Sequence, residues 1–285
     1  MHNLKIYALN VNEIIKNINN EKTFTFSKIS IEFWMMAWRA FAQMGTDIKK
    51  LDSKQLKNKK FISLLAKNMI DVWNVKMKNG RPWKGSNLVF ERILQMIMEE
   101  QLPNFMLGIN EPLGKRKQDR YLYLNPQANL FLQKFLHNQT IIHDSNCWKY
   151  WAHDGTIDLF MKNLSNKNVT IIGPSHLKDF NEKVKIKKFN HIQIHDREAA
   201  LHTIVYSKEI IKQHSSDDYK VYLIQGGSAA MDLCILLHDK MQNCCIIDIG
   251  RAIDVYYYYD PIRKKYPKWY WGGWLDVKPP KWLLK

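Results

Sequence analysis

Two short apolar runs with an amphipathic segment between them form the clearest pattern along the chain. Residues 221–224 and 244–249 are rich in β-branched side chains, which is typical of strands buried on both faces. Between them, apolar residues recur at the spacing of one helix face: Ala230, Leu233, Cys234, Leu237 and Met241. This pattern predicts two parallel strands joined by a helix in a right-handed crossover.

The same alternation extends back to residue 140. Apolar strands are predicted at residues 140–144, 168–173 and 189–195, and a helix at 154–163. A further helix begins at Asp196 and carries apolar residues on one face: Leu201, Ile204, Val205 and Ile211. Alternating strands and helices predict an α/β fold with a doubly wound, mostly parallel, Rossmann-like sheet.

The first half of the chain has a mainly helical pattern. Residues 24–28 alternate between aromatic and small polar side chains, which predicts a strand, and an aromatic helix opens at Glu32. Amphipathic segments predict four more helices: residues 12–18, 57–73, 87–101 and 125–137. We therefore expect a single domain over residues 1–285, with a mainly helical insertion at 45–139 and an aromatic tail at 255–285.

The composition supports a folded core in a reducing compartment. Hydrophobic residues make up 46% of the chain and ten residues are tryptophan, which is ample for a core. The four cysteines include no C-x-x-C pair, which argues against a structural zinc site. No apolar run approaches the ~20 residues that span a bilayer. The N-terminus also lacks the pattern of a signal peptide, so we expect a cytoplasmic protein without a transmembrane segment.

The formal net charge of +16 suits several anionic partners. Nucleic acid, an anionic membrane surface, sugar nucleotides and lipid-linked phosphates would all be attracted by it. The lysines are scattered along the chain rather than gathered in one basic arm. Charge alone therefore does not select a partner, and the sequence does not favour nucleic acid.

The glycine-rich turn after the strand at 221–224 is the first candidate site. Gly226 and Gly227 give a sharp turn, and Ser228 suits the N-cap of the following helix, so the turn offers amide groups and a helix dipole to a phosphate. Asp248 and Asp254 lie at and just beyond the end of the next strand, at the edge where parallel sheets bind ligands. Together they suggest a nucleotide diphosphate, with or without a divalent metal. The alternative is a tight connection and a capping residue with no ligand.

Two other strand ends have similar features. Gly173 is followed by Pro174 and Ser175, which predicts a second turn with a small hydroxyl at a helix N-cap. Glu32 opens a helix directly after a buried strand, where the helix dipole favours a carboxylate. The aromatic and basic residues 256–274 suit either stacking on sugar rings or packing of the tail over the sheet.

The run from residue 224 to 259 resembles the C-terminal part of small glycosyltransferases with the GT-D fold. Members typically have a glycine-containing strand–helix turn, a strand that ends in Asp-hydrophobic-Gly, and then an Asp-x-Glu motif. Here the strand end is Asp248-Ile249-Gly250 and the later motif is Asp254-Val255-Tyr256, so Tyr256 replaces the glutamate. Residues 24–32 are similar to the opening segment of these families, although Ser30 and Ile31 replace its glycines.

The resemblance implies a role for several residues. Lys28 and Glu32 would line the donor-sugar pocket, with Glu32 as a donor contact or general base, and Ser145 and Asn146 would lie near the nucleotide. Asp248 and Asp254 would bind the diphosphate or a divalent metal, Mn²⁺ or Mg²⁺. Because Tyr256 replaces the glutamate, lysine or arginine side chains are the alternative to a metal.

These observations lead to one main hypothesis and two others. The main one is a glycosyltransferase that moves a sugar from a nucleotide-diphosphate sugar to a glycan, glycolipid or protein acceptor, with Glu32 and Asp254 as catalytic residues. The second is a non-catalytic nucleotide or nucleic-acid binder on the same sheet. The third is a degenerate transferase that acts as a structural partner. A homo-oligomer is compatible with all three.

Overall fold

The structure is a computed structural model that describes residues 6–76, 86–99, 101–109, 125–139, 141–195 and 199–257. Of Ile31 and Glu32 only the backbone is described.

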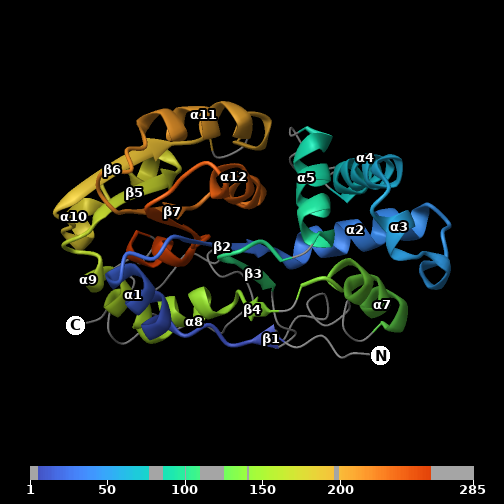
Figure 1. The fold of residues 1–285 in the computed structure, drawn as a ribbon, viewed down its shortest axis with the longest axis horizontal. Helices are drawn as coiled ribbons and strands as arrows, with labels where there is room; N and C mark the ends of the chain where they lie inside the picture. Colours follow the sequence, from blue (N-terminus) through green and yellow to red (C-terminus); the bar gives the residue numbers. More distant parts are fainter. Residues whose placement is uncertain are drawn as a thin grey trace.

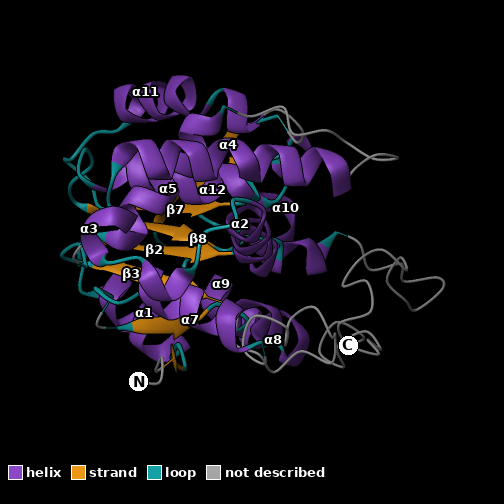
Figure 2. Ribbon diagram, turned by 90° about the vertical axis from the view of Figure 1, so that its right-hand side faces the viewer, coloured by secondary structure: helices purple, strands orange, loops and turns teal. Residues whose placement is uncertain are grey.

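Eight parallel strands form one sheet, which confirms the predicted fold class (Figure 1). Their order across the sheet is β1-β4-β3-β2-β8-β7-β5-β6. In chain order they are β1 Ile6–Tyr7, β2 Phe24–Ile29, β3 Phe105–Ile109, β4 Ile142–Asp144, β5 Asn168–Gly173, β6 Lys188–Gln193, β7 Lys220–Ile224 and β8 Cys244–Asp248. The strands lie between two layers of helices (Figure 2).

The helices on one side of the sheet are α2 Ile31–Gln43, α4 Lys59–Lys76, α5 Asn87–Met98, α11 Thr203–Gln213 and α12 Ser228–His238 (Figure 1). The helices on the other side are α1 Val11–Asn19, α8 Cys147–Asp154 and α9 Thr156–Asn163. Shorter or peripheral elements are η1 Ile48–Lys50, α3 Ser53–Leu56, α7 Pro126–Phe135, η2 Ser175–Leu177, α10 Asn181–Val184, η3 Ala199–Leu201 and η4 Ala252–Tyr256. None of the described helices is long and apolar enough to cross a membrane.

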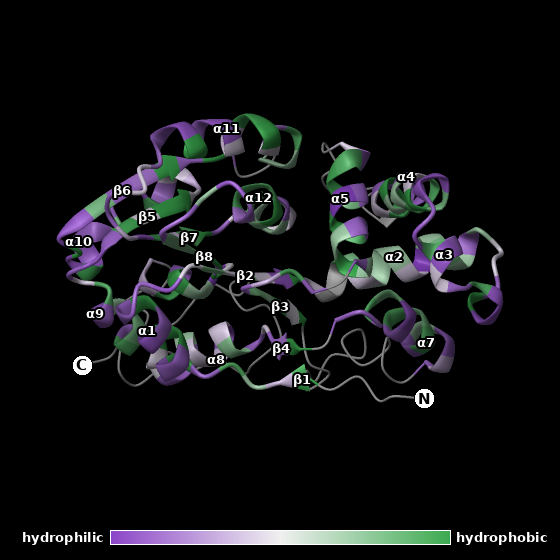
Figure 3. Ribbon diagram, in the orientation of Figure 1, coloured by the Kyte–Doolittle hydropathy of each residue, from purple (hydrophilic) through white to green (hydrophobic). Residues whose placement is uncertain are grey.

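The central strands are buried on both faces, as their β-branched runs predict. In β8, Cys245 and Ile247 pack in the cluster that contains α1, α8, α9 and η4, whereas Cys244 and Ile246 pack with α11 and α12. This alternation follows from the two-residue period of a strand. In Figure 3, β7 is coloured hydrophobic while the peripheral α10 is hydrophilic.

A central strand, β3, lies inside the range predicted as a mainly helical insertion. It pairs with β2 on one side and β4 on the other. Its sequence is short, and residues from Gly108 onward have the composition of a loop, so the pattern did not reveal it. Gly108 is needed there because a Cβ atom would lie 2.9 Å from Cζ of Phe26. The helix α8 was also not predicted, and its Trp148 and Trp151 are buried core residues.

The face that α11 buries differs from the apolar face seen in the sequence. Ile204 and Val205 are 44% and 52% exposed, and Leu201 in η3 is 46% exposed. The helix instead buries a stripe that includes Tyr206 and Ile210. The Tyr206 hydroxyl accepts a hydrogen bond from the backbone N–H of His195 at 3.3 Å, so polar contacts take part in fixing the orientation of the helix.

A buried ion pair joins two helices that are far apart in sequence. Arg92 of α5 donates from Nε and Nη2 to the two carboxylate oxygens of Asp232 in α12, at 2.7 and 2.6 Å. Asp232 is fully buried, and its carboxylate raises the pKa of Arg92 through the hydrogen bond. Because Arg92 donates to both of its oxygens, the buried Asp232 carboxylate is compensated inside the protein.

Removal of Arg92 is expected to destabilise the fold strongly. Arg92→Ala leaves the Asp232 carboxylate buried without its cation, which costs about 3 to 5 kcal/mol of unfolding free energy. Urea denaturation followed by circular dichroism measures the loss.

The exposed pair Lys188–Asp218, with side chains 61% and 63% exposed, provides the control. Lys188→Ala should change the unfolding free energy by less than about 1 kcal/mol. An equal decrease in unfolding free energy in the two variants would contradict the prediction that the buried pair contributes more to stability than the exposed pair.

Candidate functional site

The parallel register brings four strand ends to the same edge of the sheet. Ile224 of β7 is level with Asp248 of β8 and with Ile172 of β5, and Phe26 of β2 is level with Ile247. The turn after β7, the end of β8 and the end of β5 therefore lie side by side at the carboxyl edge. Open α/β sheets bind their ligands at this edge.

The turn after β7 contains two glycines, and the backbone conformation favours glycine at the second one. Gly227 has φ 56° and ψ −131°, a conformation that side chains rarely adopt. A Cβ atom on Gly226 would lie 2.9 Å from Cδ1 of Ile194. Ser228 was predicted as the N-cap of α12, but Gly227 occupies that position and no side-chain cap is present. Ser228 is the first residue of the helix, one position too late to cap it.

Asp248 and Lys28 form a pair at the centre of the edge. Nζ of Lys28 lies 3.8 Å from Oδ1 of Asp248, and the backbone N–H of Gly250 donates to the same oxygen at 3.0 Å. Asp248 is only 1% exposed, and burial raises its pKa while Lys28 acts in the opposite direction. Gly250 leaves the room that Lys28 occupies, because a Cβ atom there would overlap Nζ at 1.8 Å.

Asp254 belongs to a separate polar network. Its Oδ1 accepts a hydrogen bond from Nε2 of Gln225 at 2.8 Å and lies 3.2 Å from Nε2 of His176. Its Oδ2 accepts a hydrogen bond from Nε of Arg251 at 2.8 Å. Asp254 is 1% exposed, whereas the side chains of His176 and Arg251 are 29% and 55% exposed. A buried carboxylate thus holds two basic side chains at the carboxyl edge.

His176, Gln225 and Arg251 were not selected from the sequence. Gln225 directly follows β7 and His176 lies three residues after the end of β5, so the rule that marks strand ends as ligand sites includes both. Arg251 lies three residues before Asp254. Without the structure, nothing in the pattern shows that these side chains converge on one carboxylate.

The two aspartates that were predicted as metal ligands have different surroundings. Strand alternation places Asp248 on the α12 side of the sheet, where burial and the charge of Asp248 raise the pKa of Cys234. Asp254 lies in η4, which packs on the opposite side. Within the described ranges, no three His, Cys, Asp or Glu residues are arranged to hold a metal ion. A divalent metal at this edge stays a prediction from the resemblance.

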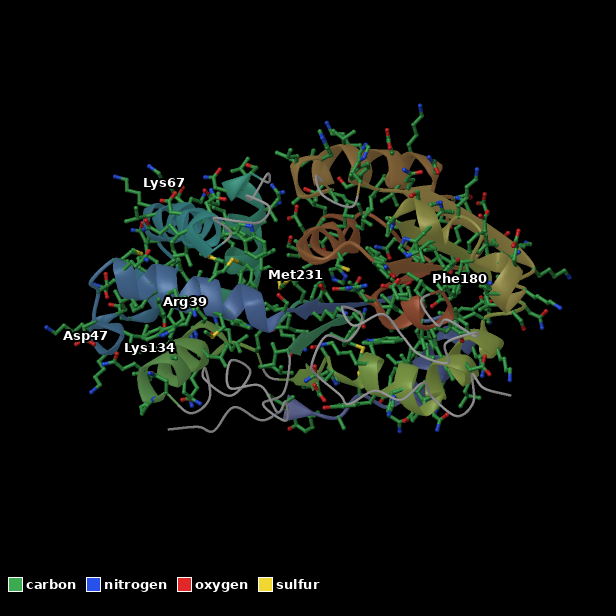
Figure 4. All side chains as sticks on the ribbon, turned by 180° about the vertical axis from the view of Figure 1, so that it is seen from behind. Arg39, Asp47, Lys67, Lys134, Phe180 and Met231 are labelled. Atoms are coloured by element: carbon green, nitrogen blue, oxygen red, sulfur yellow. The ribbon has the colours of Figure 1, made fainter. Side chains whose placement is uncertain are left out.

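Tyr256, which replaces the expected glutamate, is directed to the core. Its hydroxyl donates to Oδ1 of Asp158 in α9 at 3.4 Å, and its ring packs edge-on against Phe180 at a centroid distance of 5.6 Å. Phe180, labelled in Figure 4, also stacks on Tyr257. Burial raises the pKa of Tyr256, so its phenol stays protonated.

The turn after β5 differs from the prediction. Ser175 begins a 3-10 segment of three residues whose N-cap is Pro174, with no side-chain cap. Gly173 serves packing, because a Cβ atom there would lie 2.6 Å from Cδ1 of Leu177. So short a segment has little dipole to offer a phosphate.

The remaining predicted residues lie on the other half of the edge. Ser145 and Asn146 follow β4, which is separated from β8 by β3 and β2, and both are buried. The N–H of Asn146 donates to Oδ1 of Asp144 at 2.8 Å. Glu32 lies in the first turn of α2 next to the end of β2, where Ser30 is the N-cap and accepts from the N–H of Phe33. Residues 258–285, which include most of the predicted aromatic tail, lie outside the described residues.

The raised pKa of Asp248 predicts a pH-dependent cost in stability. A carboxyl whose folded pKa exceeds its unfolded value favours folding at low pH, and this contribution is lost as the pH rises through the folded pKa. Each unit of difference corresponds to about 1.4 kcal/mol. Asp248→Asn, which keeps an oxygen for the Gly250 N–H, should therefore gain stability relative to the wild type as the pH rises from 4.5 to 8.

Urea denaturation across that pH range measures this difference. Asp218→Asn is the control, because the Asp218 side chain is 63% exposed. A difference between Asp248→Asn and the wild type that does not change with pH would contradict the prediction.

Comparison with known proteins yields a structural likeness only. No family model and no curated protein matches the chain. A solved structure described as a new glycosyltransferase (DUF1792) from Streptococcus sanguinis is similar at a TM-score of 0.53 and 11% sequence identity, covering 89% of this chain and 84% of that chain. A selenomethionine-substituted structure of domain of unknown function 1792 has a TM-score of 0.51 at 11% identity, covering 89% of this chain and 81% of that chain. The chain therefore shares the fold of these glycosyltransferase-like proteins.

Proposed function

We propose that the protein is a glycosyltransferase that uses a nucleotide-diphosphate sugar as donor. The observation that carries the proposal is the concentration of basic side chains and a glycine turn at the carboxyl edge of the sheet. Lys28, the Gly226–Gly227 turn and Arg251 all lie at the ends of β2, β7 and β8 or just beyond them. The shared fold with the DUF1792 structures supports the same conclusion.

The diphosphate fits the middle of this edge. The eleven residues of α12 direct the positive end of a helix dipole at the glycine turn, and Gly227 leaves the approach open because no heavy atom lies within 4 Å of its Cβ direction. Lys28, in the neighbouring strand β2, adds a positive charge next to Asp248. Both groups would stabilise negative charge on the leaving diphosphate.

The transfer exchanges one bond for another at the anomeric carbon. The bond from this carbon to the diphosphate oxygen breaks, the acceptor oxygen bonds to the carbon, and the acceptor proton passes to a general base. Glu32 is the residue proposed for this base, because its helix starts at the end of β2, beside β8. Asp254 is proposed to act by positioning its basic partners.

The net charge of +16 favours one competing function, a non-catalytic binder of nucleic acid. Incubation of the full chain with UDP- and GDP-sugars, followed by detection of released nucleoside diphosphate, separates the two functions. Release of nucleotide supports the transferase. Tight binding of random RNA or DNA with a steep salt dependence, and no release, supports the binder.

Lys28→Ala is expected to weaken the binding of UDP or GDP by at least about 10-fold, which corresponds to about 1.4 kcal/mol. The reason is the loss of a positive charge next to the diphosphate. Isothermal titration calorimetry measures the affinity. Lys188→Ala, which removes an exposed lysine at the far edge of the sheet, should bind like the wild type.

Gly227→Ala is expected to lose nucleotide affinity in addition to stability. Its φ of 56° makes a side chain costly by about 1 kcal/mol or more, and the methyl group would lie on the approach to the turn. Gly45→Ala is a matched control, because Gly45 has φ 64° and is equally open but follows α2. Equal nucleotide affinity in the two variants would remove the turn from the site.

A further inference from the structure

The network around Asp254 joins three segments at the carboxyl edge: η4 with the residue before it, the turn after β7, and η2. Asp254 comes from η4, Gln225 follows β7, His176 belongs to η2 after β5, and Arg251 precedes η4. Burying an ionised carboxylate away from water costs several kcal/mol of free energy, unless nearby cations and hydrogen-bond donors compensate for the lost hydration. Gln225, His176 and Arg251 supply that compensation. The carboxylate and these three side chains therefore hold one another in place.

Asp254 restricts two basic side chains that reach the surface. A hydrogen bond from Nε to Oδ2 of Asp254 holds the guanidinium of Arg251, while 55% of that side chain remains exposed. His176 is held at 3.2 Å and is 29% exposed. A basic group that is already held in place loses less conformational entropy when it binds an anion. Arginine in particular matches the geometry of phosphate oxygens.

Two buried polar atoms without partners belong to this network or lie next to it. Oε1 of Gln225 and the hydroxyl of Tyr257 lack a hydrogen-bond partner in the part of the chain that the structure describes. Gln225 is 6% exposed, and its amide bonds Asp254. The ring of Tyr257 lies 5.4 Å from that of His176. Such orphaned groups are uncommon in folded proteins and point to a ligand or an ordered water.

The orphaned atoms also indicate what the ligand carries. Oε1 of Gln225 only accepts hydrogen bonds, and a diphosphate has no hydrogens to donate at neutral pH. Sugar and ribose hydroxyls do donate. A ligand with hydroxyl groups on one side and a diphosphate on the other thus matches Gln225 and Arg251 together.

These observations argue against the arrangement in which two carboxylates hold a metal at this edge. Asp254 already binds Arg251 and His176, and Asp248 forms a separate pair with Lys28. At the position where the resemblance implies a glutamate, this chain has Tyr256, whose hydroxyl donates to Asp158. A metal would have to displace the basic side chains from Asp254.

We propose that Asp254 is a positioning residue that holds Arg251 and His176 against the donor diphosphate in place of a divalent metal. This inference rests on the proposed function, because the diphosphate is that of the sugar nucleotide. Arg251 and His176 take up the negative charge that develops on the leaving diphosphate, and Oε1 of Gln225 accepts a hydroxyl of the donor.

Calorimetric titration of the full chain with UDP, GDP and inorganic pyrophosphate tests the proposal, in EDTA and in Mn²⁺. The affinity in EDTA is expected to be within about 3-fold of that in Mn²⁺. Arg251→Ala should lower the affinity at least 10-fold in EDTA, and Arg251→Lys should recover part of it. Arg39→Ala is the control, since Arg39 is an exposed arginine of α2 at the opposite end of the molecule from Phe180 (Figure 4).

A double-mutant cycle tests the positioning role of Asp254. Asp254→Asn should lower pyrophosphate affinity in EDTA, and combining it with Arg251→Ala should add little, because both changes remove the same held cation. Thermal melts identify variants that do not fold, and Arg251→Lys keeps the test valid if Asp254→Asn is one of them. Independent, additive losses would overturn the positioning role.

The outcomes separate this inference from the proposed function. Binding of UDP or GDP that requires Mn²⁺ and is unchanged in Arg251→Ala overturns the metal-free site and leaves the transferase standing. Binding of pyrophosphate through Arg251 in EDTA, without release of nucleotide from any sugar nucleotide, supports the anion site and removes the transferase. Absence of binding in all conditions overturns both.

Discussion

The parallel pairing of β2 with β8 is the interaction on which the rest of the structure depends. It joins the N-terminal set of strands, β1 to β4, to the C-terminal set, β5 to β8, in a single sheet. It also places Lys28 at the end of one strand beside Asp248 at the end of the other. Without this pairing, neither half would have a completed carboxyl edge, and the charges gathered there would have no common location.

The chemistry at this edge follows from a division between the two faces of the sheet. Alternation along β8 sends Asp248 toward α12, and the 3-10 segment after the strand returns Asp254 to the opposite side. Each buried carboxylate has its own basic partner: Asp248 pairs with Lys28, and Asp254 pairs with Arg251. One sheet edge thus presents two separate charge pairs, an arrangement better suited to an elongated anion than to one compact ion.

Elements could be predicted from the sequence where a clear strand or helix periodicity of apolar residues was present. They were predicted poorly where tertiary packing determined the structure. The strands β5, β7 and β8 and the helix α12 have strong patterns and were located to within one or two residues, apart from the longer C-terminal reach expected of α12. The strand β3 was missed because its five residues run into a loop-like segment. The buried face of α11 was wrong because Tyr206 and Ile210, with small polar neighbours, outweigh a more apolar stripe. For the site, the edge was predictable from strand ends, but the convergence of His176 and Arg251 depends on three-dimensional packing.

The distance along the chain between β2 and β8 has a consequence for how the protein is made. Phe24 pairs with Cys245, so β2, which is synthesised early, has to wait for the last described strand before its second neighbour is available. Contacts of such long range slow folding and leave an unpaired strand edge in the growing chain. During translation, β2 would remain open on the ribosome until β8 emerges, a period in which chaperones have an exposed substrate.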